Sequence, residues 1–228
     1  MQEFNPMINI KKYFTLILAF LTLPLLYSFS SHSFCLSGLT SFSTALPEFG
    51  NKVFLRPDPK LKIEARTEEQ RVKNKIRKVI SKYRAGLGMK SLKHVPHRIY
   101  QESKKYDYDP LFLTALIVTE SSFNNWAKSS KGALGLMQIK PRTGHAMASE
   151  MGTAWAGKST LFDPSTNIAL GAFYLNKLKK RFKDMNIALE AYNHGPSRIA
   201  HYLRNGKLPE DYSKRVLRIY DLIRSQSI

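Results

Sequence analysis

The stretch DPLFLTALIVTE, residues 109–120, predicts a buried helix that ends in an ionisable side chain. Asp109 can cap this helix, and Pro110 suits its first position because proline has a fixed φ angle and no N–H to satisfy. The residues that follow are almost all apolar, so we expect the helix to lie in the core. Glu120 then lies about three turns into the helix, close to its C-terminus.

Glu120 is the first candidate for chemistry. Burial disfavours the charged form of a carboxyl group, and the negative end of the helix dipole disfavours it further, so we expect a raised pKa. An acid that stays protonated near neutral pH can protonate a leaving group, as cleavage of a glycosidic bond requires. The structural alternative is a glutamate that is simply the first solvated residue after a buried helix.

Two more helices are predicted from their ends. The Asp-Pro pair recurs at residues 163–164 and opens a helix with an apolar seam at spacings of three and four. Gly171 within that seam indicates close helix-to-helix packing beneath the site, because glycine inside a helix is unfavourable. Asn186 can cap a following helix over residues 187–193, which ends at a Gly-Pro pair.

Five motifs follow one another along the second half of the chain. They are Glu120-Ser121-Ser122-Phe123, the run from Ser129 to Pro141 around Gly135-Leu136-Met137-Gln138, the run from Asp163 to Leu175, Ala191-Tyr192-Asn193 with Gly195, and Tyr212 before Val216. In this order they resemble the catalytic domain of the soluble lytic transglycosylases, which are relatives of goose-type lysozyme. The resemblance covers about residues 95 to 220. Asn125, Lys140 and His194 depart from the commonest family pattern, but none of them removes an essential residue.

The resemblance implies a fold and a reaction. The fold is mainly α: a lysozyme-like helical domain with a small loop or β element. The reaction is cleavage of the β-1,4 bond between N-acetylmuramic acid and N-acetylglucosamine in peptidoglycan, with formation of a 1,6-anhydromuramoyl end. Glu120 would first protonate the glycosidic oxygen and then act as base on the C6 hydroxyl of the same N-acetylmuramic acid. No cofactor is implied.

Seven residues are the predicted substrate-binding set beside Glu120. Gln138 carries both a donor and an acceptor for a sugar hydroxyl or acetamido group, whereas Met137 would offer only its backbone carbonyl. In the resembled family, the tyrosine that matches Tyr192 reaches the cleaved linkage. The full set is Ser121, Ser129, Met137, Gln138, Tyr192, Asn193 and Tyr212.

The sequence lacks the motifs that are typical of other kinds of active site. The chain has no Gly-x-Ser-x-Gly elbow, so a serine hydrolase is excluded. His94 and His97 are three apart, but no further ligand lies nearby at a suitable spacing, so we expect no catalytic metal. Cys35 is the only cysteine and can form no intrachain disulfide, and Phe34 before it argues against a lipidation site.

Two alternatives to a transglycosylase stay open. An ordinary glycosidase uses two carboxylates, so a lysozyme-type hydrolase of the same bond would need a second one, such as Asp163. The nearest other spare carboxylate in the sequence is Glu150. The alternative from a different class is a non-catalytic murein-binding module of the cell envelope.

The N-terminal part of the chain predicts export. Lys11 and Lys12 precede an apolar run, so residues 1–35 are interpreted as a signal peptide or an N-terminal membrane anchor. Residues 36–63 contain several prolines and are predicted to be a linker, residues 64–90 a basic amphipathic helix, and residues 91–228 the catalytic domain. We therefore expect a protein of the cell envelope, either periplasmic or anchored to the outer face of the cytoplasmic membrane.

The chain is strongly basic, with a formal net charge of +19. Between Lys60 and Lys105 there are fifteen Lys or Arg residues and four Glu, which gives an excess of eleven positive charges. This charge predicts attraction to an anionic partner: peptidoglycan strands with their peptide carboxylates, acidic wall polymers, or an anionic membrane surface. We expect no nucleic-acid partner, because the leader segment indicates export and the sequence has no helix-turn-helix, zinc-finger or RNP signature. We expect a monomer.

Overall fold

The computed structural model describes residues 59–83 and 86–226. The chain divides into two units, residues 1–54 and residues 55–228. The first unit lies outside the described residues, and so do the predicted signal or anchor segment and most of the predicted linker. The account below concerns the second unit.

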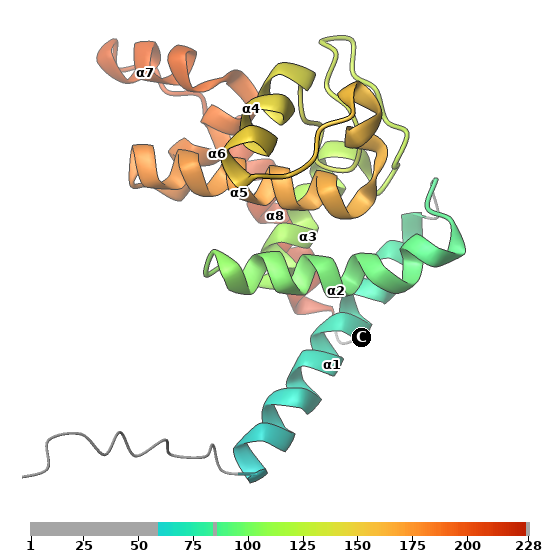
Figure 1. The fold of residues 1–228 in the computed structure, drawn as a ribbon. Coiled ribbons are helices and arrows are strands. Elements are labelled where there is room, and N and C mark those ends of the chain that lie inside the picture. Colours follow the sequence, from blue (N-terminus) through green and yellow to red (C-terminus); the bar gives the residue numbers. More distant parts are fainter. Residues whose placement is uncertain (1–58, 84–85, 227–228) are drawn as a thin grey trace, which may run out of the picture. The chain divides into compact units, whose positions relative to one another are not determined.

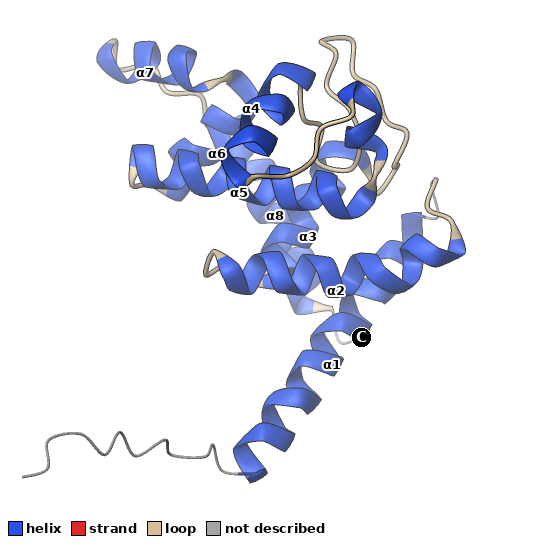
Figure 2. Cartoon of the chain, in the orientation of Figure 1, coloured by secondary structure: helices blue, strands red, loops and turns tan. Residues whose placement is uncertain are grey.

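The described part of the second unit is built from helices joined by loops (Figure 2). In place of strands it has two isolated antiparallel bridges, Lys128–Leu134 and Leu134–Ile139, in the long loop that follows the buried central helix. This matches the mainly α fold with a small β element. The elements are α1 (Pro59–Tyr83), α2 (Met89–Lys105), α3 (Pro110–Ser121), α4 (Pro141–Met151), a short 3-10 helix η2 (Gly157–Phe162), α5 (Pro164–Phe182), α6 (Met185–His194), α7 (Pro196–Arg204) and α8 (Asp211–Ser225).

Helix α3 is the centre of the core. Every residue from Pro110 to Val118 is buried, as the apolar sequence predicts. The helix packs against α8 at the far end of the chain, and also against α1 and α2 (Figure 1). Because α3 is buried along most of its length, packing fixes its position, and Glu120 lies in its last turn.

The predicted helix starts are confirmed at α3 and α5 and are wrong at α6. The Asp109 carboxylate accepts from the Leu111 N–H at 2.8 Å, and that of Asp163 accepts from the Thr166 N–H at 2.7 Å. Helix α6, however, begins at Met185, and its cap is Asp184, whose carboxylate accepts from the Ile187 N–H. Asn186 therefore lies inside the first turn. Asp184 holds the cap because its own backbone is extended, with φ −127° and ψ 136°.

The basic amphipathic helix is present with different bounds from the predicted 64–90. Helix α1 begins at Pro59, inside the segment predicted as a linker, and ends at Tyr83. Gly86 follows with a positive φ of 77°, a conformation that ends helices and that glycine adopts readily. The apolar face is buried at Ile76, Val79 and Ile80. None of the described helices is long and apolar enough to cross a membrane.

Helix α5 fixes the loop between α3 and α4 by hydrogen bonds. The fully buried Asn167 accepts from the Met137 N–H at 2.8 Å and donates to the carbonyls of Leu134 (3.1 Å) and Leu161 (2.8 Å). Gly171 lies against Met137 so closely that an added Cβ would stand 2.5 Å from the Met137 sulfur. Gly171 is therefore closely packed, but its partner is this loop and not another helix as predicted, because the Met137 side chain occupies the space that a Cβ would need.

Candidate active site

Glu120 occupies the last turn of α3 and is largely shielded from solvent. Burial raises the pKa of its carboxyl group from the ordinary 4.5 to about 7. Two groups on α8 oppose this rise: the Tyr212 hydroxyl, by its hydrogen bond, and the Arg215 guanidinium, by its charge. The balance leaves a carboxyl group that is substantially protonated at neutral pH and can still hold a negative charge. The raised pKa expected from the sequence is therefore present.

Tyr212 approaches Glu120 from the opposite helix. Its hydroxyl group donates a hydrogen bond to Oε1 of Glu120. Tyr212 is buried, and burial together with the neighbouring carboxylate raises the pKa of its hydroxyl well above the ordinary value. The phenol therefore stays protonated and remains a hydrogen-bond donor to Glu120.

A cavity of about 330 Å³ opens beside Glu120. Its walls come from the loop after α3, the start of α4, α5 and the end of α6. Of the predicted binding residues, this cavity brings together Ser129, Gln138, Tyr192 and Asn193 with Glu120. It is large enough for a sugar residue.

The other three predicted residues lie around the cavity without lining it. The Ser121 hydroxyl donates to the Leu136 carbonyl at 2.7 Å, which ties the end of α3 to the loop. Met137 is fully buried, and its carbonyl oxygen accepts from the Tyr192 hydroxyl at 2.8 Å. Tyr212 contacts Glu120 itself.

Glu120 is the only carboxylate among the described residues that line this cavity. The Asp163 carboxylate caps α5. Glu150 pairs with Lys177 on the surface. Neither candidate for a second carboxylate therefore reaches the cavity.

A model of the transglycosylase SLT domain family matches residues 97–214, just over half of the chain. The chain belongs to the transglycosylase SLT domain family. The matched residues contain α3, α5 and α6 whole, and they end within the first turn of α8. The SLT domain thus includes Glu120 and every predicted binding residue.

Relatives of the SLT domain carry matching names. The chain is 33% identical over 120 residues to a membrane-bound lytic murein transglycosylase C of Shigella sonnei, a match that covers 48% of this chain and 33% of the relative. It is 33% identical over 121 residues to a transglycosylase of the phage PRD1, covering 53% and 41%. The chain therefore spans less than half of the length of each of these relatives.

Solved structures give the same family. The 70 kDa soluble lytic transglycosylase of Escherichia coli is similar to this chain with a TM-score of 0.51 and 27% sequence identity. The match covers 56% of this chain and 24% of that protein. A complex of the 70 kDa soluble lytic transglycosylase with bulgecin A is similar to this chain with the same TM-score, identity and coverage.

The sequence did not single out every residue that shapes the site of this SLT domain. Asn167 lies within a motif but was given no role, although it fixes the loop that carries Met137 and Gln138. Tyr174, Lys131 and Lys140 also line the cavity. Arg215 was missed because only the packing of α8 on α3 brings its charge near Glu120.

Proposed function

We propose that this protein is a peptidoglycan lytic transglycosylase. It cleaves the β-1,4 bond between N-acetylmuramic acid and N-acetylglucosamine and leaves a 1,6-anhydromuramoyl end. The observation that carries the proposal is a single carboxylate with a pKa of about 7 in the cavity of an SLT domain. An ordinary glycosidase presents two carboxylates to the bond, one as acid and one as base or nucleophile.

Glu120 acts twice in the proposed reaction. Its protonated carboxyl group first gives a proton to the glycosidic oxygen, and the bond from C1 of N-acetylmuramic acid to that oxygen breaks. The acetamido group of the same sugar stabilises the positive charge at C1. The Glu120 carboxylate then takes the proton of the C6 hydroxyl, whose oxygen bonds to C1, and the acid is restored.

We assign to Tyr212 the role of stabilising the Glu120 anion between the two steps. After the first proton transfer Glu120 is an anion in a largely buried place, where it needs a hydrogen-bond donor. The Tyr212 hydroxyl already donates to Oε1 of Glu120. Ser129, Gln138 and Asn193 are assigned to the sugar hydroxyl and acetamido groups on the cavity wall.

Mass spectrometry of fragments released from purified peptidoglycan tests the proposal. The full-length protein should release muropeptides that are one water lighter than the hydrated forms. Glu120→Gln should lower the rate by about 10²- to 10⁴-fold, because it removes the general acid. Glu150→Gln, on the surface, should behave like the wild type and serves as the matched control.

Two other outcomes would replace the proposal. Hydrated reducing ends would make the protein a lysozyme-type hydrolase. Binding to peptidoglycan without release of fragments, by both the wild type and Glu120→Gln, would make it a murein-binding module.

The proposed site of action is the cell envelope. The support is the basic and apolar leader in residues 1–35, and the basic stretch that follows it. On α1, glutamates neutralise part of this charge: Glu68 pairs with Arg71 and Glu69 with Lys73. We assign the remaining positive charge to attraction toward anionic peptidoglycan, wall polymers or lipid headgroups.

A further inference from the structure

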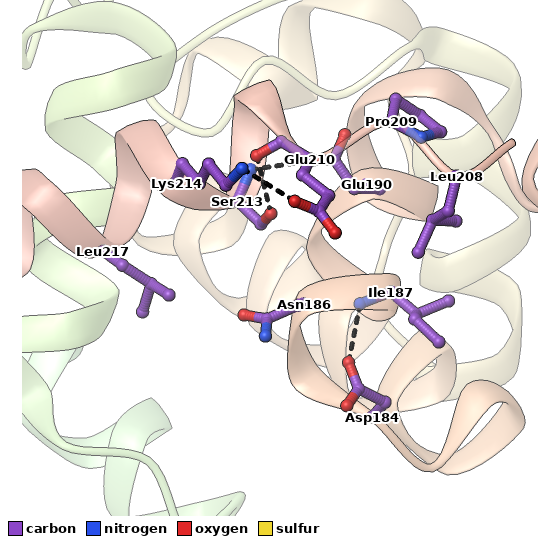
Figure 3. A pocket seen from close by; sticks show the side chains of 10 residues that line it. All are labelled: Asp184, Asn186, Ile187, Glu190, Leu208, Pro209, Glu210, Ser213, Lys214 and Leu217. Carbon is purple, nitrogen blue, oxygen red and sulfur yellow. Dashed lines mark hydrogen bonds and ion pairs between the residues drawn. The ribbon is translucent and has the colours of Figure 1, made fainter.

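Glu190 is a buried carboxylate for which the reaction above has no use. It lies on α6 with 1% of its surface exposed. A charged side chain is rarely buried to this degree unless it is paired or hydrogen-bonded. It borders a second cavity of about 320 Å³ lined by residues of α6, α8 and the segment that precedes α8 (Figure 3). The contacts of its two carboxylate oxygens explain why Glu190 is buried here.

One oxygen of Glu190 caps helix α8. Oε1 accepts a hydrogen bond from the backbone N–H of Ser213 at 2.7 Å. Ser213 is the third residue of α8, and the first N–H groups of a helix have no partner within the helix itself. Figure 3 shows the Glu190 carboxyl group directed at this backbone. The positive end of the helix dipole favours a negative charge at this point.

Helix α8 has no cap of its own. The side chain of Glu210, the residue before it, makes no capping hydrogen bond to a backbone N–H of the first turn. Its carboxylate pairs instead with the Lys214 ammonium group at 2.7 Å, on the exposed side of the helix. The start of α8 is therefore fixed by a residue of α6.

The capped turn carries Tyr212. Ser213, which Glu190 holds, is the next residue after Tyr212, whose hydroxyl donates to Glu120. The other oxygen of Glu190, Oε2, makes no hydrogen bond but lies 3.4 Å from Nε2 of His194, within ion-pair distance. His194 lines the cavity of Glu120. Glu190 thus contacts both the wall of that cavity and the turn that presents Tyr212.

We infer that Glu190 is a positioning residue for the reaction: by capping α8 from α6, it holds the Tyr212 hydroxyl against Glu120. It touches neither the substrate nor the reacting atoms. The inference rests on the proposed role of Glu120 as acid and base. It adds a residue outside α8 that fixes the turn carrying Tyr212.

A mutant cycle tests the coupling between Glu190 and Tyr212. Glu190→Ala should lower kcat by about tenfold to a hundredfold with little change in KM, because a small misplacement of a group at the reacting centre has effects of this size. Tyr212→Phe should do the same. Since both act on one contact, the double variant should lose much less than the product of the two single losses.

Two further variants separate positioning from general stability. Glu190→Gln keeps an oxygen that can accept from the Ser213 N–H, so it should restore much of the activity lost in Glu190→Ala. Glu210→Gln removes the carboxylate of the residue that precedes α8. This carboxylate does not cap α8, so the substitution should leave kcat unchanged. Independent, fully multiplicative losses in the double variant, or no rescue by Glu190→Gln, would overturn the inference.

A readout without catalysis keeps the test separate from the proposed function. The Glu120 pKa can be measured by NMR from the chemical shift of the Glu120 carboxyl carbon as the pH is varied, in isotopically labelled protein. The signal is assigned by its absence in Glu120→Gln. Tyr212 and Arg215 on α8 face Glu120 and lower its pKa, whereas Tyr192 faces it from α6. Glu190→Ala should therefore raise the Glu120 pKa in the same direction as Tyr212→Phe.

The outcomes of this titration are distinct. An unchanged Glu120 pKa in folded Glu190→Ala would overturn the inference even if the enzyme were a transglycosylase. A raised pKa, in a protein that releases no anhydro products, would support the positioning role while the proposed function failed. If Glu190→Ala does not fold, Glu190→Asp is titrated instead, because its shorter side chain keeps the charge but withdraws the cap; the same upward shift is expected, and its absence overturns the inference.

Discussion

Glu120 is held between two opposing effects. Removal of its carboxyl group from water favours the neutral acid, whereas the Tyr212 hydroxyl and the Arg215 charge favour the anion. Neither effect alone would suit the proposed reaction, in which Glu120 gives up a proton and then takes one back. Their balance sets a pKa of about 7, at which both the acid and the anion are populated near neutral pH.

Burial of Glu120 should make the protein less stable at high pH. The folded carboxyl group has a pKa of about 7, above the ordinary 4.5 that applies when the chain is unfolded. The folded state therefore binds more protons between these values, so the free energy of unfolding falls as the pH rises from 4.5 to 7. The total effect is roughly 3 kcal/mol.

Glu120→Gln removes this titration. Urea unfolding should find the variant more stable than the wild type at pH 8, and the advantage should shrink at pH 4 by up to roughly 3 kcal/mol. An advantage of the same size at both pH values would contradict a raised pKa at Glu120.

Tyr212→Phe removes the hydrogen bond that favours the Glu120 anion. The Glu120 pKa should rise, so the alkaline limb of the pH–rate profile should move to higher pH. The maximal rate should fall about tenfold to a hundredfold, as expected when a hydrogen bond to a charged group is lost. Tyr220→Phe is the control on the same helix, because its hydroxyl donates to Asp109 and not to Glu120. An unchanged alkaline limb in Tyr212→Phe would argue against the assigned contact.

Helix starts show how far local sequence specifies each element. At α3 and α5 an aspartate is followed by proline, and the proline marks which residue is the cap. At α6 both Asp184 and Asn186 can cap, and no proline decides between them. The structure selects Asp184, and so starts the helix two residues earlier than residue 187. At α8 no local residue caps the helix at all.

The cap of α6 can be tested by a matched pair of variants. Asp184→Ala should lower the free energy of unfolding by about 1 kcal/mol, because it leaves the Ile187 N–H without its acceptor. Asn186→Ala should change it by less than about 0.5 kcal/mol, since alanine is the better residue within a helix. Thermal or urea unfolding of the two variants measures the difference, and the opposite order would restore Asn186 as the cap.

The site is assembled from segments that are far apart in the chain. Glu120 comes from α3, the loop residues from before α4, Tyr192 from α6 and Tyr212 from α8. All of them belong to the unit of residues 55–228. The chemistry is therefore expected to be independent of the N-terminal segment.

Deletion of residues 1–35 tests this independence. The truncated protein should be recovered in the soluble fraction and should release the same fragments from peptidoglycan as the full chain. If it stays with membranes, a high-salt wash distinguishes the cause, because salt screens the attraction of the basic region to anionic lipids. Loss of fragment release by a folded truncated protein would contradict the assignment of the chemistry to the second unit.

The sequence by itself determined the helical class, the buried α3, the caps at α3 and α5, and Glu120 as the candidate acid. These follow from periodicity, from Asp-Pro pairs and from the placement of one carboxyl group after an apolar run, all of which are local features. Only the tertiary structure decided that Asp163 lies outside the cavity, that Met137 is held by Asn167 and Tyr192, and that Glu190 caps α8. The reason is that hydrogen bonds between distant helices depend on packing, which brings together residues that no spacing along the chain relates.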